Sequence, residues 1–189
     1  MLQFGPMSGE LQAVLELQSE SEAETIVWGR RIGEWLVPGD LILLLAPFGA
    51  GKTHFAKGIA AGLGADPDEV NSPSFVLINE YAAGPQHNRM PIYHADLYRI
   101  ETAHDLATVG LEDCIDGDGV CVIEWAERAA ALLPRDRLVV QIEETGENSR
   151  RLRLIPYGPR YELLVAEVAS SLGSTQTAGI RAEGDAAGD

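Results

Sequence analysis

One stretch in the first third of the chain combines a strand-length apolar run, a glycine-rich loop and the start of a helix. The run 41–45 leads directly into the sequence Ala46-Pro47-Phe48-Gly49-Ala50-Gly51-Lys52-Thr53. In such a loop the glycines let successive backbone N–H groups turn toward one anion, Lys52 reaches the terminal phosphates and the Thr53 hydroxyl can hold Mg²⁺. A helix predicted over 52–63 directs the positive end of its dipole at the same anion. This order of elements predicts a phosphate-binding site.

The loop departs at its first position from the usual spacing G-x-x-x-x-G-K-[ST], because this chain has Ala46 there. Alanine at a positive φ costs about 1 kcal/mol, whereas at a negative φ it is harmless. An alternative interpretation is a buried strand that meets a helix through a glycine-rich turn and binds no ligand. The strand before the loop and the helix after it favour the phosphate-binding interpretation.

The chain has 189 residues and 46% hydrophobic content, which suits one domain with a substantial core. We expect a flexible lead-in over 1–10, the domain over 11–172 and a disordered acidic tail over 173–189, where the sequence has no core pattern. The longest uncharged apolar run is too short to cross a bilayer, and the N-terminus lacks the pattern of a signal peptide. These features predict a cytoplasmic location without membrane association.

The formal net charge of −15 disfavours direct binding of nucleic acid, whose affinity comes largely from Lys and Arg. The local concentration of arginines consists of Arg150, Arg151 and Arg153. On a predicted strand we expect Arg151 on one face and the other two on the opposite face, which divides the charge. Any role with nucleic acid is therefore expected to be indirect.

Hydrophobic periodicity and turn residues predict strands and helices in alternation. Strands are expected over 11–17, 41–45, 75–78, 91–95, 120–123, 138–142 and 152–155. Helices are expected over 21–36, 52–63, 103–108, 126–133 and 161–172. The third and fourth strands flank a Gly-Pro turn, and the last two flank a Gly-Glu-Asn turn, so each pair is predicted to form an antiparallel hairpin.

Two carboxylates stand at the ends of predicted strands, Glu124 after 120–123 and Asp96 after 93–95. A carboxylate at the carboxyl end of a strand beside the phosphate-loop strand would face the Mg²⁺ site, so Glu124 is the preferred metal ligand. Asp96 could orient an attacking water. The alternative for each is a carboxylate that caps the next helix. Ser74 is either a hydroxyl that senses the γ-phosphate or simply a turn residue, and the histidines are interpreted as structural or surface residues.

Four motifs, in this order and at these separations, resemble the TsaE family, also called YjeE. They are Gly49-Ala50-Gly51-Lys52-Thr53, Ser72-Pro73-Ser74-Phe75, His94-Ala95-Asp96-Leu97-Tyr98-Arg99 and Ile123-Glu124-Trp125. The similarity covers roughly residues 11–155. This family is the bacterial ATPase required for threonylcarbamoyladenosine modification of tRNA.

The resemblance implies an α/β fold of the P-loop NTPase type, a three-layer sandwich with a mostly parallel central sheet plus antiparallel hairpins. It also implies weak Mg²⁺-dependent ATP hydrolysis and action on the TsaD–TsaB complex, so that tRNA is reached only indirectly.

The resemblance also assigns roles to individual residues. Phosphate binding falls to Gly49, Ala50, Gly51, Lys52, Thr53 and His54. Mg²⁺ would be held by Thr53 and Glu124, and catalytic roles go to Lys52, Glu124 and Asp96, the last of which would also contact the nucleotide. Ser74 would be the switch hydroxyl, and the segment from Glu22 to Thr25 would lie near the adenine. Serine at position 74 keeps the hydroxyl of the more usual threonine, and His54 lies past the metal ligand, where the family often has Thr or Ser.

Two other functions share the predicted loop. A small-molecule kinase would need several arginines on a closing lid, and Arg128, Arg135 and Arg137 are concentrated on a predicted helix and its exit. A solvated helix face explains these arginines more simply. A nucleotide-gated adaptor would bind ATP and change its partner affinity without turnover.

Overall fold

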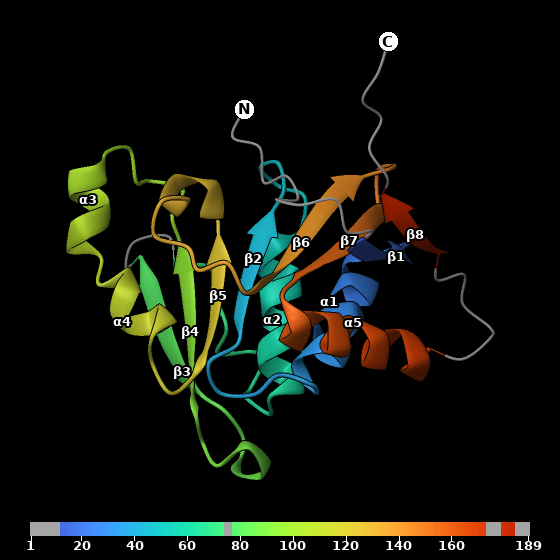
Figure 1. Ribbon diagram of the computed structural model, residues 1–189, viewed down its shortest axis with the longest axis horizontal. Helices are drawn as coiled ribbons and strands as arrows, with labels where there is room; N and C mark the ends of the chain where they lie inside the picture. The colour runs from blue at the N-terminus through green and yellow to red at the C-terminus, as the bar shows by residue number, and fades with distance from the viewer. Residues whose placement is uncertain (1–11, 74–76, 173–178, 184–189) are drawn as a thin grey trace.

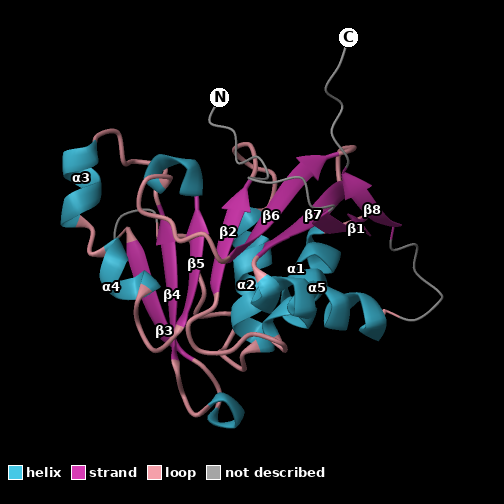
Figure 2. Cartoon of the chain, viewed as in Figure 1, coloured by secondary structure: helices cyan, strands magenta, loops and turns pink. Residues whose placement is uncertain are grey.

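The structure is a computed structural model that describes residues 12–73, 77–172 and 179–183, and it contains one twisted sheet (Figures 1 and 2). The strands are β1 (Gln12–Ser19), β2 (Leu41–Leu45), β3 (Ile78–Ala82), β4 (Pro91–Asp96), β5 (Val120–Glu124), β6 (Arg137–Glu144), β7 (Arg150–Tyr157) and β8 (Gly179–Glu183). The helices are α1 (Glu22–Gly33), α2 (Lys52–Gly62), α3 (Ala103–Thr108), α4 (Leu111–Ile115) and α5 (Pro159–Ser171), with short 3₁₀ helices η1 (Pro85–His87) and η2 (Ala126–Ala129).

The eight strands follow the order β3-β4-β5-β2-β6-β7-β1-β8. Strands β4, β5, β2 and β6 pair in parallel, and the outer pairings are antiparallel, including the predicted hairpins β3–β4 and β6–β7. This arrangement confirms the expected mostly parallel centre with antiparallel additions. The register places Glu124 opposite both Leu44 and Asp96. The carboxyl ends of the three neighbouring strands β4, β5 and β2 therefore meet at one edge of the sheet.

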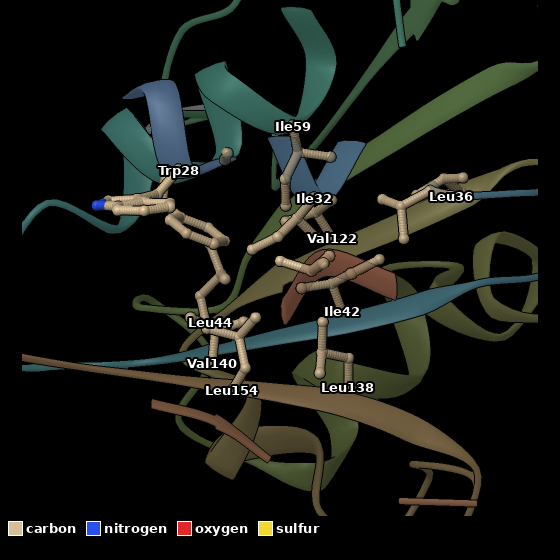
Figure 3. Packing of buried hydrophobic residues seen from close by; sticks show 14 of the residues in the cluster. Trp28, Ile32, Leu36, Ile42, Leu44, Ile59, Val122, Leu138, Val140 and Leu154 are labelled. Carbon is tan, nitrogen blue, oxygen red and sulfur yellow. The ribbon is translucent and has the colours of Figure 1, made fainter. Parts of the chain in front are cut away.

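Both faces of the central sheet are covered, which makes three layers. Along β2, Ile42 and Leu44 belong to one buried cluster and Leu41 and Leu43 to another, as alternation in a strand requires. The first cluster packs against α1, α2 and α5, and Figure 3 shows Ile32 of α1 and the strand residues of this face pointing toward one another. The second cluster includes residues of α3, α4 and η2. The apolar strands are thus shielded from water on both sides.

Helices α1 and α2 run parallel and touch through their backbones at four glycines. A Cβ added to Gly29 would lie 2.3 Å from the Phe55 carbonyl oxygen, and one on Gly58 would lie 2.2 Å from that of Ile26. One turn later, Gly33 and Gly62 repeat the contact, with the nearest backbone oxygen again at 2.3 Å and 2.2 Å. Only glycine permits this approach, and it holds the N-termini of the two helices at the same end of the molecule.

We predict that Gly58→Ala destabilises the protein. Alanine gains about 1 kcal/mol in helix propensity, but its Cβ meets backbone atoms that no side-chain rotation can move, so separating the helices should cost more. We expect a net loss of about 1–2 kcal/mol in the free energy of unfolding, measured by chemical denaturation. Lys57→Ala in the same helix inserts no atom and is the control. A Gly58→Ala variant as stable as the control would contradict the close contact.

The structure corrects several expected element boundaries. Strand β3 begins at Ile78, later than the predicted start at 75, and residues 74–76 lie outside the described part. The predicted helix over 126–133 is wrong, because these residues contain only the short 3₁₀ helix η2, which follows Trp125 with its left-handed φ of 58°. The short helix α4 was not predicted at all.

The expected disordered tail is also wrong over residues 179–183. This segment forms β8, which pairs antiparallel with β1, from Gln12 opposite Glu183 to Glu16 opposite Gly179. Backbone hydrogen bonds to an open sheet edge need no apolar pattern in the sequence, so composition gave no signal. The remaining residues of the expected lead-in 1–10 and tail lie outside the described part.

Candidate functional site

The glycine-rich loop joins β2 to α2, and two of its glycines take left-handed backbone conformations. Gly49 and Gly51 have positive φ values of 85° and 106°, and Gly51 is the N-cap of α2. Ala46 is not among the described residues with positive φ, so its methyl group costs nothing at this position. The departure from the usual spacing therefore leaves the loop geometry intact.

Lys52 is buried beneath the loop. Its ammonium donates hydrogen bonds of 2.9 Å to the carbonyl oxygens of Ala46 and Pro47, and it lies 4.0 Å from the centre of the Trp125 ring. Burial lowers the pKa of Lys52, while the carboxylates of Glu124 and Asp96 act in the opposite direction. The ammonium is thus held without an ion pair to either acid, at the first turn of α2.

Thr53, Glu124 and His94 form a hydrogen-bonded group below the loop. The Thr53 hydroxyl donates to Glu124 Oε1 at 2.9 Å, and His94 Nε2 lies 2.9 Å from the same oxygen. Glu124 and His94 are each 2% exposed. Hydroxyl and carboxylate oxygens are hard donors that suit Mg²⁺, and the Thr53 hydroxyl keeps lone pairs when its proton is donated. The donor set therefore fits the metal that the loop implies.

Asp96 ends β4 beside Glu124. Its Oδ2 accepts from the Ser72 hydroxyl at 3.1 Å, and its Oδ1 accepts from the Tyr98 backbone N–H at 2.9 Å. These bonds fix the carboxylate, and an ionised carboxylate has further lone pairs with which to accept a proton or a water hydrogen bond.

A cavity of about 410 Å³ lies at this edge of the sheet. Its lining includes the predicted residues Gly49, Gly51, Lys52, Thr53, His54, Asp96 and Glu124. It also includes residues that sequence reasoning did not assign to the site, namely Phe48, Ser72, Pro73, Leu77, Tyr98, Arg99 and Trp125. Sequence reasoning thus identified the lysine and the two carboxylates of the cavity and named Trp125 only as a candidate for a docking patch near the nucleotide, whereas it left out Arg99, Phe48 and Tyr98.

The other predicted site residues lie around the cavity and not on its wall. Ala50 is fully buried, and Thr25 is fully buried with its hydroxyl 2.8 Å from that of Ser19. Glu22 lies 3.9 Å from His54 Nε2, which brings the start of α1 to the start of α2. Ser74 is outside the described residues.

Arg150 was missed as a site residue. Its side chain is 6% exposed and donates from Nε to the Ala50 carbonyl at 3.0 Å and from Nη1 to the Asn148 carbonyl at 2.8 Å. The expected division of the arginines was wrong, because residues two apart on a strand share a face. Arg151 and Arg153 lie together on the outer face, where they pair with Glu143 and Glu16. Of the three arginines, Arg150 therefore lies behind the loop, whereas Arg151 and Arg153 are neutralised by ion pairs on the outer face.

Three aromatic side chains form a row beside the cavity, which we call the aromatic row: Phe48, Tyr98 and Trp125. The ring centres of Phe48 and Tyr98 are 5.9 Å apart, and those of Tyr98 and Trp125 are 5.1 Å apart. Phe48 is 78% exposed and Tyr98 48% exposed. A large apolar side chain this exposed on a phosphate loop contributes little to the core.

The arginines considered for a kinase lid do not line the cavity. Arg128 donates to the Ile100 carbonyl, and Arg137 donates to the Pro134 carbonyl at 2.5 Å and stacks over Tyr157 at 4.7 Å. Arg99 is the one arginine on the cavity wall among the described residues. The geometry thus disfavours an arginine-rich lid of the kind that such kinases use.

Comparison with known proteins assigns the family. The family model described as "Threonylcarbamoyl adenosine biosynthesis protein TsaE" matches residues 19–152. The chain belongs to the TsaE family. The TsaE match confirms the resemblance seen in the sequence and places the chain in a family of tRNA threonylcarbamoyladenosine biosynthesis. The matched region contains the phosphate loop, Asp96 and Glu124.

Individual relatives of this TsaE chain agree. The tRNA threonylcarbamoyladenosine biosynthesis protein TsaE of Bacillus subtilis is 37% identical over 155 residues, which cover 82% of this chain and 94% of that protein. The protein of the same name from Treponema pallidum is 37% identical over 134 residues, covering 71% and 95%. The crystal structure of Bacillus subtilis YdiB superimposes with a TM-score of 0.71 at 32% identity and covers 87% of this chain and 99% of that one. Within the described residues, no helix is long and apolar enough to cross a membrane.

Proposed function

We propose that this TsaE-family chain binds ATP with Mg²⁺ in the cavity, hydrolyses it, and thereby serves tRNA threonylcarbamoyladenosine formation in the cytoplasm through the TsaD–TsaB complex. The observation that carries the proposal is the convergence of the phosphate loop, the Thr53–Glu124 pair and Asp96 on one cavity at the N-terminus of α2. A glycine-rich loop without a ligand would need neither a buried ammonium nor two carboxylates at the ends of adjacent strands.

Each residue has a role that its environment supports. Lys52 would turn from the neutral loop carbonyls to the terminal phosphates, and the loop N–H groups would bind the remaining phosphate oxygens. Thr53 and Glu124 would hold Mg²⁺, which neutralises charge on the phosphate oxygens when bound. Asp96, fixed by Ser72 and the Tyr98 backbone, would orient the attacking water and accept its proton.

Lys52→Ala should weaken ATP binding at least about tenfold, because a charge-assisted hydrogen bond contributes about 1.5–3 kcal/mol. The fold should survive, since the carbonyl of exposed Pro47 can bind water instead. Titration with a fluorescent ATP analogue, alongside thermal melting, measures both. Lys57→Ala, on the same helix, is the control and should leave the affinity unchanged. Equal affinities for the two folded variants would refute the phosphate-binding assignment.

Glu124→Gln should keep nucleotide binding and lose about 100-fold or more in hydrolysis rate. The amide oxygen can still accept from Thr53 and His94, so the shape of the site is kept while the negative charge is lost. Phosphate release under saturating Mg²⁺ and ATP, with the TsaD–TsaB complex present, measures the rate. Exposed Glu112→Gln serves as the control. Full activity of the Glu124→Gln variant would leave Glu124 only a structural role.

If the unmodified chain binds ATP but shows no turnover even with the partners, the nucleotide-gated adaptor replaces the ATPase as the proposed function.

The aromatic row gives the partner complex a place to bind. We infer that the TsaD–TsaB complex contacts Phe48 and Tyr98, which are exposed at the rim of the cavity. Because Phe48 belongs to the loop proposed to bind phosphate, both the partner and the nucleotide would then affect the conformation of that loop. A net charge of −15 and the neutralised Arg151 and Arg153 support a protein partner and not direct binding of tRNA.

Phe48→Ala should leave the ATP affinity of the isolated chain within about twofold and reduce stimulation by the TsaD–TsaB complex about tenfold or more, since aromatic residues at the centre of interfaces often contribute about 2 kcal/mol. Leu163→Ala, at an apolar side chain 65% exposed on α5, is the matched control. The measurement is ATPase rate against partner concentration. Unchanged stimulation of the Phe48→Ala variant would show that Phe48 is not part of the interface with the TsaD–TsaB complex.

A further inference from the structure

We propose that His94 is a positioning residue that fixes the Glu124 carboxylate for the divalent cation. The proposal rests on the proposed function and adds a residue to it. His94 was interpreted from the sequence as structural or surface, since it forms no metal-ligand pair with another histidine. The structure places it instead against the carboxylate that ends the neighbouring strand.

The contact is set by the pairing of β4 with β5. His94 lies two residues before Asp96, and Glu124 is opposite Asp96, so the imidazole and the carboxylate meet on the face of the sheet that carries α2. His94 Nε2 and the Thr53 hydroxyl both bind Oε1 at 2.9 Å. No other hydrogen bond reaches this carboxylate in the part of the chain that the structure describes. Two donors on Oε1 leave Oε2 as the oxygen that a cation can take.

An ionised carboxylate oxygen only accepts, so the imidazole donates to it from Nε2–H. The other ring nitrogen, Nδ1, is buried without a hydrogen-bond partner among the described groups. A buried polar atom without a partner costs about 1–3 kcal/mol, which an apolar side chain of the same shape would avoid. Stability alone therefore does not account for an imidazole here, whereas a donor that holds Glu124 in one rotamer does.

If His94 holds the Glu124 carboxylate in place, its loss should lower the affinity for the metal ion. Loss of a group that orients a metal ligand typically costs about 10–100-fold in metal affinity, because the ligand must be ordered when the metal binds. Nucleotide binding without metal involves the loop and Lys52, which His94 does not touch. The two measurements therefore separate a positioning role from general damage to the site.

Four variants make the test. His94→Leu removes the donor and keeps the bulk; His94→Asn keeps polarity but places its amide nitrogen near the position of Nδ1; His94→Gln restores an N–H near the position of Nε2. His104→Leu, at an exposed position of α3, is the control. A fluorescent ATP analogue is titrated first in EDTA and then at fixed analogue against MgCl₂, with thermal melting of each ligand-free variant.

In EDTA all variants should bind the analogue within about threefold of the unmodified chain. The half-saturating MgCl₂ should rise about 10–100-fold for His94→Leu and His94→Asn, and less than about threefold for His94→Gln and the control. If His94→Leu melts early, the comparison of His94→Asn with His94→Gln decides the matter.

Equal MgCl₂ requirements for the His94→Asn and His94→Gln variants would overturn the positioning role, and so would a loss of binding in EDTA that matches the loss in MgCl₂. Failure of the unmodified chain to bind the analogue under either condition would instead count against the proposed function. The two failures are thus distinguishable.

Discussion

Parallel pairing of β2, β4 and β5 is the constraint on which the site depends. Their register sets Leu44 and Asp96 on either side of Glu124, so the phosphate loop and two carboxylates leave the sheet at one edge. A shift of β5 by one residue would send Glu124 to the opposite face, away from Thr53, because side chains alternate along a strand. The same shift would also exchange Val120 and Val122 with Cys121 and Ile123 between the two buried faces, where close packing fits each pair to different neighbours. The chemistry of the edge is therefore fixed by the core behind it.

The glycine contact between α1 and α2 is the second constraint. Parallel helices in backbone contact bring the start of α1 to the phosphate loop, so that a Cβ on Gly51 would lie 3.8 Å from the Thr25 Cγ2 methyl and 3.3 Å from Arg150 Nε. The loop is thus bounded by α1 on one side and by Arg150, from β7, on another. Residues far apart in the sequence therefore define the shape of the loop. A change in how α1 packs on α2 would shift the loop through these packing contacts.

The sequence predicted most of what local patterns control. The strand, loop and helix from Leu41 onward, both hairpins, and the acids at strand ends follow from apolar runs and turn residues. What it missed depends on distant partners. Arg150 serves the loop because β7 passes behind it, and β8 exists because β1 offers an open edge. The left-handed backbone of Trp125 ahead of the short η2 was also missed, because a tryptophan gives no local signal for a positive φ. The glycines of each helix are spaced four residues apart in the sequence, Gly29 and Gly33 in α1 and Gly58 and Gly62 in α2. This spacing alone does not predict that the two helices pack against each other.

Buried charges in this chain fall into two kinds. Asp40 is 3% exposed and receives two hydrogen bonds from Arg160, at 3.0 Å and 2.6 Å, and a third from the Val37 N–H, so its charge is paired within the fold. Lys52 and Arg150 are buried to a similar degree, yet within the described residues they donate to neutral backbone carbonyls. A buried cation without an anionic partner is costly, and a polyanionic ligand beside the loop would offset that cost. Both of these cations therefore lie at the glycine-rich loop, where the proposed polyanionic ligand would supply the negative charge that the fold itself does not place beside them.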